Sequence, residues 1–363
     1  MTESPQFDPN DLSYETVYAR LKGCRIALIG GAGFIGHNLA LELARAGAQV
    51  LVVDNLMVNN FVDHLYGTQP HKVQSLAYQG FLLDRFTLMR DAGVRLANAD
   101  ARNYMDLANA LQEFSPEKLV HLSAISSAVE AARNPGLCFD LQLITLRNLL
   151  EWVRANMDIQ RQVMFLSSST VYGDFETPTV DESVRPKPKG IYANAKYMGE
   201  RLMRTYRHSH GLPITIIRPS ALYGERCISR RVSQVFIENA LQGKPLLLEG
   251  GGDGRLDFTY IEDLVEGMVR ALALPEGVST TLNITFGNAR TIAELAAVVQ
   301  QVVPNVILED RPRAELKPIR GTLSIERAAT AIGFKAKWKL EDGYLRYCQW
   351  YADQWERAKK KLG

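Results

Sequence analysis

The sequence predicts an α/β fold, a doubly wound parallel sheet, on three observations. Short apolar runs without alternation recur along the chain, which is typical of strands buried on both faces. A helical pattern follows most of these runs, and strands that alternate with helices form parallel sheets covered on both sides. A glycine-rich turn joins the first run to the first helix. Together these features indicate a Rossmann-like sheet.

Each strand of this sheet follows from one apolar run. We expect strands at Arg25–Gly30, Gln49–Asp54, Val94–Ala99, Leu119–Ser123, Val163–Ser167 and Ile214–Arg218. We expect helices at Tyr14–Leu21, Ile35–Ala46, Tyr104–Phe114, Leu137–Ala155 and Ala193–His208. Residues 57–90 predict a loop and a helix. The segment 137–155 is apolar nearly all round, which indicates burial on two sides.

The regular alternation weakens after Gly224. Here the pattern predicts helices at Val232–Gln242, Ile261–Ala273, Thr291–Val303 and Leu340–Lys360, and strands at Pro245–Glu249 and Thr281–Phe286. We therefore expect a smaller α+β domain that interrupts and follows the first one. A chain of 363 residues is long enough for two such domains.

The composition excludes several classes of protein. Lys and Arg number 42 against 40 Asp and Glu, so the net charge of +2 favours neither nucleic acid nor an anionic membrane as a partner. No apolar run reaches the roughly 18 residues of a membrane span, and the polar N-terminus is not a secretory signal. The four cysteines and six histidines show no metal-ligand spacing. We expect no metal, reduced thiols and a cytoplasmic protein.

The glycine-rich turn predicts a dinucleotide site. Glycines at 30, 33 and 36 allow a tight turn, a close approach to a pyrophosphate, and helix amides directed at the phosphates. Asp54 ends the second strand, where a carboxylate accepts hydrogen bonds from the adenosine ribose, although a plain turn residue is the alternative. Asp54 would repel a 2′-phosphate, and the following Asn55-Leu56 supplies no cation. The pattern therefore favours NAD over NADP, and Asp100 is a candidate for the adenine amine or a simple turn residue.

A tyrosine and a lysine form the second chemical signal. Tyr192 and Lys196 are spaced i, i+4, so they share one helix face, and the ammonium favours the phenolate that acts as a general base. A surface phenol–amine pair is the common meaning of such spacing. Here the pair follows the hydroxyl-rich end of a strand, Ser167–Gly173, which faces the ligand crevice of a doubly wound sheet. This context favours a catalytic pair.

These motifs resemble the extended short-chain dehydrogenase/reductases, in the nucleotide-sugar epimerase/dehydratase branch. The resemblance runs from about Arg25 to Tyr351. The motifs that carry it are Gly30–Gly36, Asp54-Asn55-Leu56, Asp100, His121–Ala124, Ser167–Gly173, Tyr192–Lys196, Arg218-Pro219, Leu222–Gly224 and Asp257–Asp263. It implies an NAD-binding Rossmann domain at 24–220 with about 258–290. It also implies a substrate-binding domain at 221–257 with about 291–363, and residues 1–23 form an N-terminal extension.

The resemblance assigns roles to individual residues. Ser168, Tyr192 and Lys196 are the expected catalytic residues, and the apolar segment 137–155 is expected to pair two copies in a homodimer. The expected NAD contacts are Gly30, Gly33, Phe34, Ile35, Gly36, Asp54, Asn55, Asp100, Ala101, Ser123, Ala124, Tyr192, Lys196 and Pro219. The expected contacts to a nucleotide-diphosphate sugar are Ser126, Ser127, Ser169, Thr170, Arg226, Arg231, Arg255 and Arg311.

The type of reaction follows from residues that are absent. The resembling dehydratases have Asp and Glu where this chain has Ser169 and Thr170, and the decarboxylases keep a Glu at the second place. Without these carboxylates, elimination and decarboxylation are the less favoured reactions. The sequence predicts an epimerase that oxidises the sugar transiently, at C4, and returns the hydride to the other face. A 4-dehydrogenase or ketoreductase is the alternative, and a non-catalytic NAD sensor or scaffold is the alternative outside enzymes.

The substrate side departs from the resembling proteins. Ala221 stands where many have Asn, Leu256 stands where they have Arg with Arg255 beside it, and Arg311 begins an altered motif. A cluster of Arg226, Arg230 and Arg231 follows Gly224 and could rebuild a diphosphate site, because Arg binds phosphate in a bidentate manner. A surface salt-bridge cluster is the alternative for Arg230 and Arg231. Cys227 is a candidate extra proton donor or a small buried residue.

Overall fold

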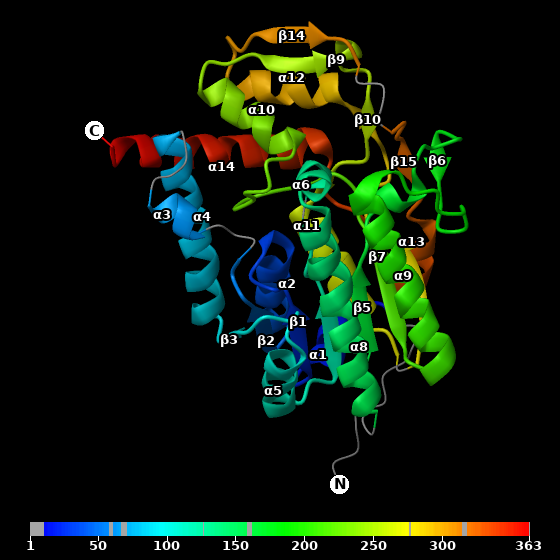
Figure 1. Cartoon of the computed structure of the whole chain (residues 1–363). Helices are drawn as coiled ribbons and strands as arrows, with labels where there is room; N and C mark the ends of the chain where they lie inside the picture. Colours follow the sequence, from blue (N-terminus) through cyan, green and yellow to red (C-terminus); the bar gives the residue numbers. More distant parts are fainter. Residues whose placement is uncertain are drawn as a thin grey trace.

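The centre of the structure is a sheet of seven strands in which every neighbouring pair is parallel (Figure 1). The computed structural model describes residues 11–57, 61–66, 71–125, 127–157, 162–275, 277–313 and 318–362. Within them the strand order is β12-β7-β5-β4-β1-β2-β3. The bounds are β1 Arg25–Ile29, β2 Gln49–Asp54, β3 Arg95–Asn98, β4 Lys118–His121, β5 Gln162–Leu166, β7 Ile214–Arg218 and β12 Thr280–Asn283. The predicted fold class is confirmed.

The two faces of the sheet are apolar because alternate residues of each strand point in opposite directions. In β1, Ile26 and Leu28 join the core on the side of α2, whereas Ala27 and Ile29 join the core on the side of α5. All four side chains are fully buried. This explains why the strand reads as a continuous apolar run rather than as an alternation.

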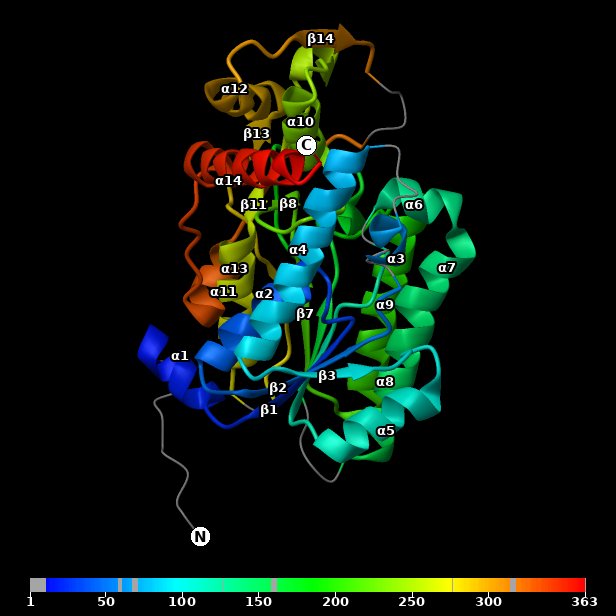
Figure 2. The ribbon, with the colours of Figure 1, turned by 90° about the vertical axis from the view of Figure 1, so that its left-hand side faces the viewer.

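Helices cover both faces (Figure 2). One face carries α1 Tyr14–Leu21, α2 Phe34–Arg45, α11 Ile261–Leu272 and α13 Glu326–Ile332, and the other carries α5 Tyr104–Phe114, α8 Thr145–Ala155 and α9 Gly190–His210. The short helices α6 Ala128–Arg133 and α7 Pro135–Phe139 precede α8. No helix in the described part of the chain is long and apolar enough to cross a membrane.

The helix expected at 137–155 is interrupted. Residues Asp140–Ile144 form a π-helical turn between α7 and α8. The side-chain hydroxyl of Thr145 donates to the carbonyl of Leu141, and the same oxygen lies 2.8 Å from Nε2 of the buried His121. Buried apolar residues of α8 share one core with residues of α5 and α9. Neighbouring helices of the same chain therefore cover much of the apolar surface that the sequence reading assigned to a second copy.

A smaller layer lies beyond the carboxyl ends of the strands (Figure 1). It contains α10 Val232–Leu241, α12 Ile292–Val302, the parallel pair β9 Leu246–Glu249 and β14 Leu308–Arg311, and the antiparallel pair β10 Arg255–Leu256 and β13 Arg290–Thr291. Two further parallel pairs join distant segments, namely β8 Leu222–Tyr223 with β11 Thr259–Tyr260 and β6 Thr179–Val180 with β15 Thr322–Leu323. The long helix α14, Leu340–Lys360, lies beneath this layer.

The segment between β2 and β3 holds the short α3, Phe61–Leu65, and the twenty-residue α4, Lys72–Asp91. α4 lies against α14 in both views (Figures 1 and 2). The ring of Phe81 on α4 has its centroid 4.8 Å from that of Trp350 and 5.4 Å from that of Tyr351. This aromatic contact joins a segment inserted in the sheet region to the C-terminal helix.

Two motif aspartates hold the C-terminal segments to the sheet region. The carboxylate of Asp257 accepts hydrogen bonds from the amides of Gly287 and Leu323 and from the hydroxyl of Thr285. Asp263 accepts from the amides of Lys337 and Trp338. Burial raises the pKa of each carboxyl to about 6, although these donors act in the opposite direction. Both aspartates are therefore structural anchors for main chain that returns late in the sequence.

A buried ion pair fixes α9 against the sheet. Arg218, at the end of β7, donates two hydrogen bonds of 2.8 and 2.6 Å to the carboxylate of Glu200 on α9. The hydroxyl of Ser167, just after β5, donates to the same carboxylate at 2.7 Å. The side chains of Arg218 and Glu200 are 2% and 0% exposed, so the pair is shielded from solvent.

We expect Glu200→Ala to destabilise the protein by about 3–5 kcal/mol, because it leaves the Arg218 guanidinium buried without its partner. Urea unfolding followed by fluorescence measures this loss. Glu113→Ala is the matched control, because Glu113 forms an exposed pair with Arg95 and such pairs contribute little. Equal losses in the two variants would contradict the structural role of the buried pair.

Candidate active site

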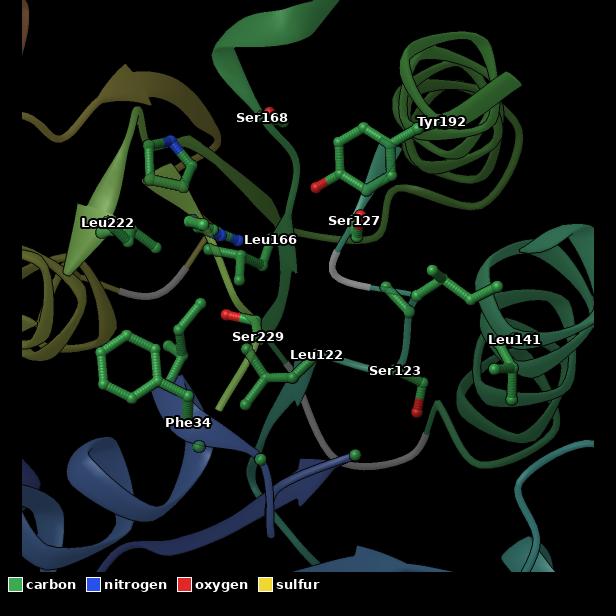
Figure 3. A pocket seen from close by; sticks show the side chains of 18 of the residues that line it. Phe34, Leu122, Ser123, Ser127, Leu141, Leu166, Ser168, Tyr192, Leu222 and Ser229 are labelled. Atoms are coloured by element: carbon green, nitrogen blue, oxygen red, sulfur yellow. The ribbon is translucent and has the colours of Figure 1, made fainter. Parts of the chain in front are cut away.

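A cavity of about 630 Å³ lies at the carboxyl ends of the strands, between the sheet and the smaller layer (Figure 3). Its walls come from the segments after β1, β2, β4, β5 and β7, from α9, and from the connection that leads into α10. The sheet order reverses between β1 and β4, and ligands of doubly wound sheets bind at such a point. The topology therefore places the cavity where a dinucleotide is expected.

The glycine turn after β1 packs main chain closely against main chain beside the cavity. Gly30 has φ +76°, and a Cβ on it would lie 2.6 Å from the amide nitrogen of Ser123. A Cβ on Gly36 would lie 2.3 Å from the carbonyl oxygen of Gly31. Helix α2 begins at Phe34, so its first amides face the cavity that Gly33 and Phe34 line. This cradle fits the pyrophosphate of a dinucleotide.

Asp54 lies at the end of β2 and lines the cavity. Its carboxylate accepts hydrogen bonds from the amides of Ala32, at 2.9 Å, and Leu56, at 2.8 Å. Burial raises the pKa of this carboxyl, whereas the two amides lower it. Each oxygen retains a lone pair for a ribose hydroxyl. Asp54 thus both shapes the glycine turn and remains available to a ligand.

Asp100 and Asn55 are bonded to each other at the far end of the cavity. The Asn55 amide donates to Asp100 at 3.1 Å, and Arg102 donates to both oxygens of the same carboxylate. The hydrogen bonds from Arg102 are the largest cause of the lowered pKa of Asp100. Ala101 also lines this end. The sequence reading did not assign Arg102, because its role depends on a turn that directs it back to Asp100.

Ser168, Tyr192 and Lys196 converge from two elements. Ser168 follows β5, and Tyr192 extends its hydroxyl from α9 into the cavity (Figure 3). The amide and hydroxyl of Thr170 donate to Ser168 Oγ at 3.2 and 3.0 Å. Because Ser168 Oγ accepts both of these bonds, its own proton is free to be donated toward Tyr192 or a ligand oxygen. Thr170, expected to touch substrate, therefore also orients Ser168.

Lys196 is buried beneath the tyrosine. Its Nζ donates to the carbonyl of Leu166 at 2.8 Å and lies 5.9 Å from the centroid of the Tyr192 ring. Burial, together with the nearby charge of Arg231, lowers the pKa of Lys196 to about 7. Burial raises the pKa of Tyr192, whereas Arg231 and a hydrogen bond from Ser168 lower it. Burial therefore keeps the pKa of the Tyr192 phenol above its ordinary value, and two neighbours, Arg231 and Ser168, act in the opposite direction.

The expected nicotinamide end of the cavity is apolar with a few hydroxyls. Ser123, Ala124, Leu166 and Pro219 line it together with Phe34 (Figure 3). Ser127 also lines the cavity, and its Oγ caps the start of α6 by accepting from the amide of Glu130. Ser126, the other expected sugar contact, lies outside the described residues.

Three of the four arginines expected to bind substrate do not line the cavity. The guanidinium of Arg226 lies 5.9 Å from the centroid of the Trp350 ring on α14. Arg255 is exposed and donates a hydrogen bond to the carbonyl of Ala289. Arg311 is exposed on β14 and donates to the carboxylate of Glu309. The fourth, Arg231, lines the cavity together with its neighbour Arg230.

Two further arginines line the cavity that the sequence reading did not assign. Arg85 comes from α4, is fully buried, and donates to the carbonyl of Arg226. Arg320 comes from the connection before β15 and donates to the hydroxyl of Ser169. Neither sits in a recognisable motif, so only the packing of distant segments reveals them.

A buried carboxylate positions the arginine-bearing connection. Glu238 on α10 accepts hydrogen bonds from Tyr78 on α4, from Tyr351 on α14 and from Gln234 on its own helix. The guanidinium of Arg230 approaches the same carboxylate at 3.3 Å. The backbone of Arg230 has φ +47°, a conformation that residues other than glycine rarely adopt. Surrounding contacts must therefore hold it there.

Cys227 is 2% exposed and does not line the cavity. Its Sγ lies 3.0 Å from the hydroxyl of Ser229, which does line it. The placement favours the reading of Cys227 as a small buried residue over that of a proton donor.

Comparison with known proteins identifies the family. The model of the NAD dependent epimerase/dehydratase family matches residues 26–285. The chain belongs to this family. NAD is accordingly the cofactor that the cradle around Gly30 and Asp54 fits.

Individual relatives are distant but match over most of their length. The chain is 29% identical to UDP-glucuronate 4-epimerase 1 of Arabidopsis thaliana, over 92% of this chain and 77% of that protein. It is 26% identical to a putative UDP-glucose 4-epimerase of Methanocaldococcus jannaschii, over 90% and 97%. The crystal structure of Thermus thermophilus UDP-glucose 4-epimerase with NAD matches with a TM-score of 0.74 and 26% identity, over 90% and 98%.

We expect Arg231→Gln to raise the pKa of the Tyr192 phenol, because the charge that favours the phenolate is removed. A pH titration of phenolate absorbance, taken as the difference between each protein and its Tyr192→Phe counterpart, measures this pKa. Arg230→Gln is the matched control, because the neighbouring arginine is not among the groups that shift Tyr192. An unchanged titration in Arg231→Gln would show that Arg231 does not tune the base.

Proposed function

We propose that the protein is an NAD-dependent epimerase of a nucleotide-diphosphate sugar, acting at C4. One observation carries this reading. Among the described residues that line the cavity, the carboxylates are Asp54 and Asp100, and both lie at the adenosine end. The end with Ser168, Tyr192 and Lys196 offers a base and hydroxyls but no acid pair for elimination or decarboxylation.

The residues of this site divide the work on one sugar hydroxyl. Ser168 donates a hydrogen bond to the oxygen of the sugar hydroxyl. Tyr192, as a phenolate, removes the proton of that hydroxyl. Lys196, held by the Leu166 carbonyl, lies beneath the Tyr192 ring, where its protonated form favours the phenolate. Bound NAD supplies the site that accepts the hydride and returns it. When the keto sugar turns in the cavity, Tyr192 gives the proton back to the opposite configuration.

The diphosphate is expected near the start of α10. Arg230, Arg231 and the first helical residues, Val232 and Ser233, line the cavity there. A helix N-terminus and two guanidinium groups are both suited to phosphate oxygens. The activities of the relatives make UDP-sugars the first substrates to test.

Two alternatives remain to be separated from this function. A 4-dehydrogenase or ketoreductase would use the same three residues but release or consume NADH in proportion to sugar. A sensor or scaffold would bind NAD without turnover. The hydrogen bonds that position Ser168 and Lys196 favour a catalytic role over that of a sensor or scaffold.

We also propose a cytoplasmic homodimer. All four cysteines are free thiols, which suits a reducing compartment. The outer side of α9 carries the exposed Met198, at 49% exposure, near a shallow hollow lined by Tyr197, Arg201 and His208. This exposed surface of α9 supports the expectation of a homodimer.

We expect the purified protein to interconvert UDP-sugars that differ at C4 without net formation of NADH. Proton NMR of the sugar pool and absorbance at 340 nm measure both quantities. Tyr192→Phe should lower kcat about 100-fold to 10,000-fold, because the general base is lost. Formation of NADH in proportion to the sugar consumed would favour the dehydrogenase instead. Full activity of Tyr192→Phe would contradict the assignment of Tyr192 as the general base.

A further inference from the structure

Arg320 brings a positive charge to the catalytic end of the cavity. Its Nη2 donates to the hydroxyl of Ser169, the residue that follows Ser168, and its guanidinium carbon lies 5.1 Å from the centroid of the Phe175 ring. Its Nε is shielded from solvent and has no hydrogen-bond partner. The ion pairs of the described residues do not include Arg320. Its donors are thus only partly used within the chain.

The acid group that most affects Arg320 is already engaged. Asp174 forms a 2.5 Å ion pair with Lys189 and accepts the amide of Ile319. Burial lowers the pKa of Arg320 to about 10, so the guanidinium stays charged at neutral pH. By contrast, the fully buried Arg218 has the carboxylate of Glu200 as a bidentate partner, whereas Arg320 is half-buried and has none among the described residues. A half-buried charge that lacks such a partner and has a shielded, unused N–H donor is unfavourable, so a ligand anion in the cavity is the expected complement.

The geometry of a pyranose ring decides which anion can lie there. If Ser168 and Tyr192 hold the oxygen at C4, the side chain bonded to the adjacent Ser169 lies beside the neighbours of C4. The diphosphate is attached at C1, across the ring from C4, and is therefore the wrong end of the substrate for this arginine. C5, next to C4, carries the exocyclic C6, the one ring substituent there that can be oxidised to a carboxylate.

We propose that Arg320 recognises a carboxylate at C6, so that the preferred substrate is a nucleotide hexuronate. This inference rests on the proposed reaction at C4. The planar fork of a guanidinium pairs with both oxygens of a carboxylate, which a hydroxymethyl group at C6 cannot offer. Arg320 is in this account a specificity residue, and the chemistry stays with Ser168, Tyr192 and Lys196.

The test compares kcat/KM for UDP-glucuronate with kcat/KM for UDP-glucose in the full-length protein. We expect the wild type to prefer UDP-glucuronate, and the preference ratio to fall about 10- to 100-fold in Arg320→Gln, the loss typical of a hydrogen bond to a charged group. Arg320→Lys should give an intermediate ratio, because it keeps the charge and loses the fork. Arg313→Gln, an exposed arginine of the same connection, should leave the ratio unchanged.

Binding of UDP alone identifies the part of the substrate that Arg320 contacts. Titration calorimetry should give the same affinity for UDP in the wild type and in Arg320→Gln, because UDP has no sugar. A parallel loss of UDP affinity would place Arg320 at the diphosphate and overturn the proposal. A wild-type preference for UDP-glucose, or equal losses for both sugars in Arg320→Gln, would overturn it as well.

A binding measurement separates this inference from the proposed function. Tyr192→Phe, which lacks the base, is titrated with both UDP-sugars, with and without Arg320→Gln. If the wild-type protein epimerises neither sugar but binding still shows a preference for UDP-glucuronate that depends on Arg320, the proposed function is contradicted and the role of Arg320 in specificity is supported. If the protein epimerises the sugars at C4 but shows no preference that depends on Arg320, the proposed function is supported and the role of Arg320 in specificity is contradicted.

Discussion

The geometry of the catalytic end depends on one buried ion pair, between Glu200 and Arg218. Glu200 lies one helical turn beyond Lys196 on α9, and Arg218 ends β7, while Ser167 of the β5 segment donates to the same carboxylate. The pair therefore joins α9, which carries Tyr192 and Lys196, to the end of β7, and the bond from Ser167 joins the same carboxylate to the end of β5 next to Ser168. Because both charges are shielded, small displacements are costly, and this stiffness keeps a phenol and a serine hydroxyl at working distance without direct covalent restraint.

The residues at the cofactor end of the cavity could be predicted from short stretches of the sequence. Continuous apolar runs, a glycine turn and an aspartate at the end of the second strand are all features of neighbouring residues, and β1, β2 and the turn at Gly30 follow from them directly. The same holds for the i, i+4 pair Tyr192 and Lys196, because a helix alone brings the two side chains together. Where a motif and its structural element coincide, sequence reasoning placed the residue in the cavity.

The substrate side was harder because its residues meet through contacts between distant segments. Arg85 reaches the cavity from α4 and Arg320 from a connection more than 140 residues after β5, and neither has a local pattern. Arg311, expected at the diphosphate, lies instead on the exposed strand β14 beside Glu309. The direction of an arginine after a turn depends on backbone angles such as φ +47° at Arg230, which the residue type does not reveal.

The anchoring of the C-terminal connection by Asp257 affects how such a site can diversify. Asp257 accepts the main-chain amides of Gly287 and Leu323 rather than their side chains. A residue carried between such anchors can be exchanged without loss of the bonds that hold its backbone. Position 320 is therefore free to vary independently of the segment that carries Ser168, so the proposed sugar preference can change through a single side chain while Ser168, Tyr192 and Lys196 stay in place.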